Sequence, residues 1–102
     1  MSDSKKKKEI NIELDQETAQ GTYSNLAIIN HSVLEFVVDF INIMPGSPKA
    51  KVRSRIILTP QHAKRFVKAL NDNVQRFENA HGEIKDYEQP PIPLNFGPPG
   101  EA

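Results

Sequence analysis

The sequence predicts an α+β fold, with an antiparallel β-meander of about four strands followed by one long C-terminal amphipathic helix and a proline-rich tail. Three observations predict it. Apolar and polar residues alternate along several stretches between Ile10 and Leu58. Apolar residues then recur at helical spacing from Ala63 to Phe77, between a Thr-Pro pair and a glycine. Five of the eight prolines follow Asp86, which predicts an extended tail instead of a further packed element.

The chain of 102 residues has room for one domain at most. Residues 1–8 contain four consecutive lysines, which predicts a disordered lead. Residues 9–85 form the expected single α+β domain. Residues 86–102 are expected to be disordered or polyproline II, or, because Ile92, Leu94 and Phe96 alternate, to dock as an extended segment on the same or a neighbouring subunit. A domain this small is marginally stable by itself, and without cysteine it has no disulfides, so we expect oligomerisation.

The first two strands are predicted at Ile10–Leu14 and Thr22–His31. The first alternates strictly between apolar and polar residues, as a half-buried strand does. Residues 15–21 are polar and end in glycine, which suits a loop, although helix-forming residues there also allow a short turn. The second strand is apolar on both faces in its middle, so both faces should be covered.

The third and fourth strands, Leu34–Met44 and residues 49–58, are predicted to form a hairpin around the Pro-Gly-Ser-Pro turn at 45–48. A slip of one residue would place apolar side chains opposite charged ones. The predicted register therefore pairs Phe36 with Leu58, Val38 with Ile56, Val37 with Ile57 and Asp39 with Arg55.

A helix should begin after Thr59, an N-cap, with Pro60 in the first helical position. Gly82 should end it in a left-handed conformation. A helix of this length spans about 30 Å, close to the length of a ten-residue strand, so it should pack along one face of the sheet. Its apolar stripe comprises Ala63, Phe66, Val67, Leu70, Val74 and Phe77.

The opposite sheet face mixes apolar and charged side chains. It is too apolar for a free surface and too charged for an ordinary core, which indicates a sheet-on-sheet interface between subunits of a homo-oligomer, a dimer or higher, or with another protein partner. The candidate interface residues are Val37, Asp39, Ile41, Ile43, Arg53, Arg55 and Ile57.

Positive charge gathers between Phe40 and Asn71, where there are seven basic residues and no acidic one. This pattern has two interpretations, pairing with the acidic strands or binding of a polyanion such as nucleic acid, and the first is favoured. The phenylalanines fall on core faces and offer no stacking platform, so nucleic-acid binding would be sequence-tolerant and salt-dependent. The candidate polyanion-binding residues are Lys51, Arg53, Arg55, Lys64, Arg65 and Lys68.

No motif in the sequence carries catalytic, cofactor or metal chemistry. The histidines at 31, 62 and 81 are not at metal-ligand spacing, and no Walker, nucleophile-elbow or zinc-protease motif is present. We therefore expect a non-enzymatic protein without a cofactor. No apolar run reaches membrane-spanning length and no apolar segment follows the first lysines, so a cytoplasmic protein with no membrane partner is expected.

Two segments, TYSNLAIINHSVLEFVVDFINIMPG and SRIILTPQHAKRFVKAL, carry a resemblance. They are similar to a family of short uncharacterised bacterial proteins, frequent in Bacteroidetes and known as a domain of unknown function. The resemblance covers roughly residues 10–84 and implies no activity. A looser similarity of topology, together with the LNF segment at 94–96, is to the SecB export chaperones; it implies an oligomer that holds unfolded chains. The sequence lacks the second helix and the longer acidic body of SecB.

Overall fold

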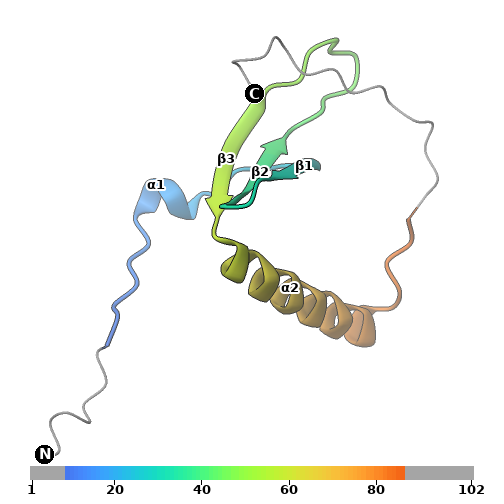
Figure 1. Cartoon of the computed structure of the whole chain (residues 1–102). Coiled ribbons are helices and arrows are strands. Elements are labelled where there is room, and N and C mark those ends of the chain that lie inside the picture. Colours follow the sequence, from blue (N-terminus) through green and yellow to red (C-terminus); the bar gives the residue numbers. More distant parts are fainter. Residues whose placement is uncertain (1–8, 87–102) are drawn as a thin grey trace, which may run out of the picture. The chain divides into compact units, whose positions relative to one another are not determined.

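The structure, a computed structural model, describes residues 9–86 and has an α+β fold (Figure 1). The described strands are β1 (Leu26–His31), β2 (Phe36–Ile41) and β3 (Val52–Leu58). They form one antiparallel sheet in the order β1-β2-β3, so β2 is central and β1 and β3 are the edges. The chain divides into two compact units, one ending at Arg65 and one beginning at Phe66. Helix α1 (Gln16–Ala19) precedes the sheet in the chain, and helix α2 (Pro60–His81) follows it.

The prediction of a strand at Ile10–Leu14 is wrong. Within the described residues this segment joins no ladder, and Ile10, Ile12 and Leu14 are 84%, 90% and 69% exposed. The short turn allowed after it is present as α1, whose N-cap Asp15 accepts a hydrogen bond from the Thr18 amide at 2.8 Å. Alternation makes a segment suitable for a half-buried strand, but a strand also needs a neighbour to complete its backbone hydrogen bonds.

The β2–β3 hairpin has the predicted register over most of its length. Phe36 lies opposite Leu58, Val38 opposite Ile56 and Asp39 opposite Arg55. Its loop contains the expected turn, because the Ser47 amide donates to the Met44 carbonyl at 3.2 Å. Gly46 has a φ of 82°, the left-handed conformation that a type II turn requires after proline.

The predicted register fails at one end of this hairpin. The pairing shifts between Phe40 and Ile41, so that Phe40 lies opposite Ser54 but Ile41 lies opposite Val52. Arg53 is left without a partner in the ladder, as the extra residue of a β-bulge. The alternation of apolar and polar residues alone cannot reveal such an insertion, because Val52 and Arg53 still alternate in the sequence.

Strand β1 begins at Leu26, later than predicted. Just before it, the Asn25 amide donates to the Ile41 carbonyl at 3.1 Å, and side chains make the other bonds to β2. The Ser24 hydroxyl lies 2.9 Å from the Ile41 carbonyl oxygen. The Asn25 side-chain amide donates to the Ile43 carbonyl at 2.9 Å, and its oxygen accepts from the Ile43 amide at 2.7 Å. The Asn25 side chain thus completes the pairing of β2 beyond its last strand residue.

We predict that Asn25→Asp lowers the free energy of unfolding by about 1 kcal/mol, because aspartate keeps the acceptor for the Ile43 amide but loses the donor to its carbonyl. Urea unfolding at fixed protein concentration measures this. Asn25→Ala should in addition lose the exchange protection of the Ile43 amide, which the aspartate variant retains. Asn11→Asp, at an exposed position outside the sheet, is the matched control and should change stability by less than about 0.5 kcal/mol. Equal stability of the two aspartate variants would contradict the prediction.

Helix α2 begins and ends where the sequence predicts. The Thr59 hydroxyl accepts from the His62 amide at 3.1 Å, and Pro60 is the first helical residue. At the other end Gly82 has a φ of 98°, and its amide donates to the Glu78 carbonyl at 2.8 Å. The packing of this helix along a sheet face stays a prediction.

The most buried residues of the described chain all belong to the central strand. They are Asp39, Ile41 and Val38, which are 1%, 6% and 8% exposed. The expected lead at 1–8 and all of the expected tail except Asp86, including the alternatives of a docked or disordered tail, lie outside the described residues.

Candidate functional site

The cross-strand pairs bring five of the seven candidate interface residues onto one face of the sheet. Each pair of an antiparallel ladder shares a face, so Asp39 and Arg55 lie on the same side as Val37 and Ile57. Ile41 is on this side too, opposite Leu26. We call this surface the Asp39 face; it comprises Leu26, Ile28 and Asn30 of β1, Val37, Asp39 and Ile41 of β2, and Val52, Arg55 and Ile57 of β3.

Two candidate interface residues do not take part in this pairing. Arg53 is the extra residue of the bulge. Ile43 lies beyond the end of β2, where the Asn25 side chain holds its backbone. The ladder therefore does not extend the Asp39 face to either of them.

An ion pair occupies the centre of the Asp39 face. The Arg55 Nε donates to Asp39 Oδ1 at 2.6 Å, and the second bond runs from a terminal guanidinium nitrogen of Arg55 to Oδ2 at 2.8 Å. The Arg55 side chain is 39% exposed, whereas Asp39 is nearly inaccessible at 1%. Arginine matches a carboxylate in this two-bond geometry, which is stronger and more specific than a single contact. Arg55 thus covers Asp39 from the neighbouring strand.

The ion pair shifts the titration of both groups. The hydrogen bonds from Arg55 lower the pKa of Asp39 below its usual range, with a smaller contribution from the positive charge, and they outweigh the opposing effect of burial. The same hydrogen bonds raise the pKa of Arg55. The pair is therefore fully ionised in the folded protein near neutral pH.

The ion pair also selects the register of the sheet. A slip of one residue between β2 and β3 would place Asp39 opposite Ser54 or Ile56 instead of Arg55. A buried carboxylate without a partner is strongly unfavourable, so the slipped pairings are disfavoured. One charged pair thus determines which residues of β3 share the Asp39 face with β2.

The opposite sheet face is the predicted core face. It carries Phe36, Val38 and Phe40 of β2, opposite Leu58, Ile56 and Ser54 of β3. The His31 and Phe36 rings stack at its edge with centroids 5.3 Å apart. Both faces of the sheet therefore present apolar side chains, as the sequence predicts for the second strand.

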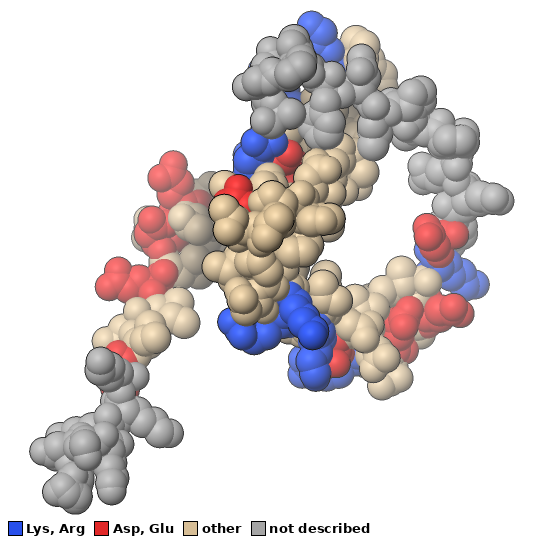
Figure 2. Space-filling view, in the orientation of Figure 1, with Lys and Arg blue, Asp and Glu red and all other residues tan. Residues whose placement is uncertain are grey.

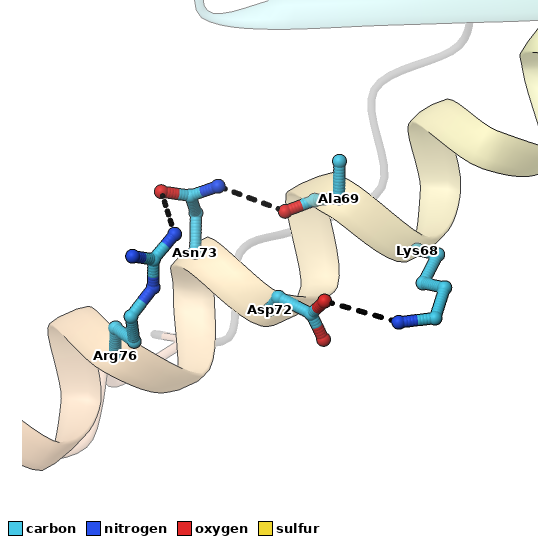
Figure 3. Close-up of polar contacts among 5 residues, drawn as sticks. All are labelled: Lys68, Ala69, Asp72, Asn73 and Arg76. Atoms are coloured by element: carbon cyan, nitrogen blue, oxygen red, sulfur yellow. Dashed lines mark hydrogen bonds and ion pairs between the residues drawn. The ribbon is translucent and has the colours of Figure 1, made fainter.

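The candidate polyanion-binding residues are not one continuous row. Arg55 is engaged by Asp39. Lys68 forms an exposed ion pair of 3.3 Å with Asp72 on the same helix (Figure 3). Lys51 and Arg53 line a hollow at the loop end of the β2–β3 hairpin, and Lys64 and Arg65 belong to the first turns of α2.

The hollow has a volume of about 380 Å³ and is lined by Asn42, Met44, Ser47, Lys49, Lys51 and Arg53. Basic side chains are visible at this end of the hairpin in Figure 2. Neither Asn42 nor Lys49 is among the candidate polyanion-binding residues that the sequence predicts. The sequence does contain one indication of this site. Lys49, Lys51 and Arg53 are spaced by two, and alternate residues of an extended segment point the same way.

The described part of the chain contains no group of three or more histidine or acidic side chains arranged to hold a metal ion. Of the helices in residues 9–86, none combines the length and the apolar character that crossing a membrane requires.

The fold and the Asp39 face define a small α+β protein whose three-stranded sheet carries a buried ion pair at the centre of an apolar surface. The chain belongs to a family described as "Protein of unknown function (DUF3467)", whose model matches residues 1–86. The resemblance to a family of uncharacterised proteins is thereby confirmed. Searches of curated proteins and of solved structures found no match, so the bacterial origin and the similarity to SecB stay predictions.

Proposed function

We propose that this protein is a non-enzymatic interaction or scaffold module that assembles into a homo-oligomer through the Asp39 face. One observation carries the proposal. Among the described residues the buried hydrophobic side chains are Val38 and Ile41, whereas Val52 and Ile57 of the Asp39 face are 43% and 57% exposed. So little buried apolar surface is insufficient for a domain of this size, and a second copy would supply the missing cover.

The composition of the Asp39 face suits an interface between identical chains. Its ion pair is satisfied within one chain, so covering the face would leave no unpaired charge behind, which is the usual penalty of a charged interface. The apolar side chains around it supply the hydrophobic contact. In a two-fold dimer the same face would meet itself, as the self-complementary surface of such an interface requires.

Light scattering at micromolar concentration tests the proposal. We expect a mass that is a multiple of the chain mass of 11.5 kDa. Ile57→Lys should weaken the association at least about tenfold, because it places a charge within the apolar contact. The folded single chain should tolerate this change, since Ile57 is already 57% exposed there.

Val33→Lys is the matched control for this experiment. It makes a similar chemical change at a side chain that is 92% exposed and lies in the β1–β2 turn, outside the sheet. Its mass and association should equal those of the unchanged protein. A strict monomer at micromolar concentration, or equal weakening by the two variants, would overturn the proposed interface.

The second candidate function is sequence-tolerant binding of a polyanion such as nucleic acid. It is favoured by Lys51 and Arg53, neither of which has an ion pair within the described residues. Contacts between basic side chains and phosphates release counterions, so this binding would weaken steeply with salt. A labelled single-stranded oligonucleotide that fails to bind at low salt would remove this candidate.

A further inference from the structure

The hollow at the loop end of the β2–β3 hairpin has the properties of an anion site. Three of its six lining residues, Lys49, Lys51 and Arg53, are basic, and none is acidic. No ion pair involves any of the three in residues 9–86. Three unneutralised cations around one hollow repel each other, and an anion bound among them would relieve this repulsion.

The β-bulge is a second, independent observation at the same place. The register shift leaves Arg53 unpaired beside the position where Ile41 meets Val52, and both Arg53 and Asn42, the residue after Ile41, line the hollow. Bulges interrupt a ladder and redirect a side chain, and they are frequent beside functional sites. Here the bulge leaves Arg53 outside the ladder, whereas Arg55, two residues later, is paired with Asp39.

Two polar side chains, with Met44, complete the lining. Asn42 makes no side-chain hydrogen bond within the described residues, so its amide nitrogen is available as a donor. The Ser47 hydroxyl donates to the Lys49 carbonyl at 2.9 Å, which holds the loop closed beside the hollow. The site thus combines three charged donors with one neutral donor. They lie on both sides of the turn at Pro45 and Gly46.

We propose that this hollow binds the phosphoryl group of a small phosphorylated molecule. A phosphoryl group carries close to two negative charges and three acceptor oxygens, which match several cationic donors better than a single carboxylate does. The volume of about 380 Å³ lies within the range of small-molecule sites and exceeds what a bare phosphate needs. The proposal does not depend on assembly through the Asp39 face.

The test is a titration of the full-length isotope-labelled chain, followed by NMR at constant ionic strength. The probes are inorganic pyrophosphate and a mononucleotide, which represent two sources of the same phosphoryl chemistry. We expect saturable shifts at the Asn42 side chain, at the Ser47 amide and at the amides of residues 49–53. Lys49→Gln combined with Lys51→Gln should weaken binding at least about tenfold, since both substitutions remove a charge-assisted hydrogen bond and tenfold corresponds to only about 1.4 kcal/mol.

Lys64→Gln combined with Arg65→Gln removes the same charge from α2 and is the matched control. It should change the affinity by less than about twofold, because long-range charge effects are screened at physiological salt. Equal weakening by the two double variants would show that only net charge matters and would overturn the proposal. Binding of a single-stranded oligonucleotide without binding of either small probe would also overturn it, and would support the polyanion function instead.

Discussion

Replacing Arg55 by glutamine should destabilise the protein more than replacing Asp39 by asparagine, although both changes break the same ion pair. The Asp39 carboxylate is nearly inaccessible, whereas Arg55 is partly exposed to water. Without Arg55 the covered carboxylate keeps its desolvation penalty and loses both charge-assisted hydrogen bonds, which should cost more than removing the Asp39 charge does. Without the Asp39 charge the arginine can still be hydrated, so Asp39→Asn should cost about 1–2 kcal/mol.

The pH dependence of stability should differ between Asp39 paired with Arg55 and Asp39 left without this partner. In the unchanged protein the pKa of Asp39 is lowered by Arg55, so the stabilisation is fully present above the ordinary aspartate range near pH 4 and is lost as the pH falls below it. In Arg55→Gln, burial without a partner should raise the pKa of Asp39. The folded form then binds a proton more tightly than the unfolded form, and acid should partly restore stability.

The measurement is urea unfolding at fixed protein concentration between neutral pH and about pH 3, because a binding partner or a change in concentration would alter the apparent stability. The difference in stability between Arg55→Gln and the unchanged protein should shrink as the pH falls. Arg53→Gln removes the same charge from a neighbouring position that has no ion pair within residues 9–86, and should change stability by less than about 0.5 kcal/mol. A difference that stays constant with pH would contradict the assigned role of Asp39.

The parts of the fold that the sequence predicts correctly are those where two independent signals agree. For the hairpin, alternation restricted the faces, and the opposite charges of Asp39 and Arg55 selected the register among the remaining pairings. For α2, the cap at Thr59 and the glycine at 82 bounded a stripe of helical period. Each signal alone permits several structures, whereas their combination permits few.

The predictions that fail rest on a single sequence pattern, or concern contacts between residues far apart in the sequence. Ile10–Leu14 alternates, but nothing in the segment reports whether a neighbouring strand exists. The bulge at Arg53 leaves the local pattern intact and appears only when the two strands are paired. The role of Asn25 depends on Ile43, eighteen residues away, so no local motif announces it.

The same distinction holds for the candidate site. Val37, Asp39 and Ile41 lie two apart on one strand, so their common face follows from strand geometry, and register then adds Arg55 and Ile57. The hollow differs because it joins two ends of a loop. Asn42 and Lys49 line it together only because the turn at Gly46 folds the chain back, a detail of loop geometry that composition does not encode.

The second large effect should come from the apolar stripe of α2. We expect Leu70→Glu to lower the free energy of unfolding of the protein by about 2–4 kcal/mol, because a charge in an apolar contact loses both the packing and its own hydration. The stripe contains Val67, Leu70 and Phe77, which are 66%, 53% and 50% exposed. Helical stability in proteins comes mainly from covering such a stripe.

Asn71→Glu is the matched control, since it introduces the same residue one position along the helix, about 100° around its axis and away from the stripe. It should change stability by less than about 0.5 kcal/mol. Urea unfolding and light scattering on the same samples then separate two roles for the stripe. If Leu70→Glu lowers the mass as well as the stability, the stripe contributes to assembly. If it lowers the stability alone, the stripe is covered within the chain, as the predicted packing on the sheet requires. Equal effects of the two substitutions would mean that the stripe stays uncovered, and would contradict both roles.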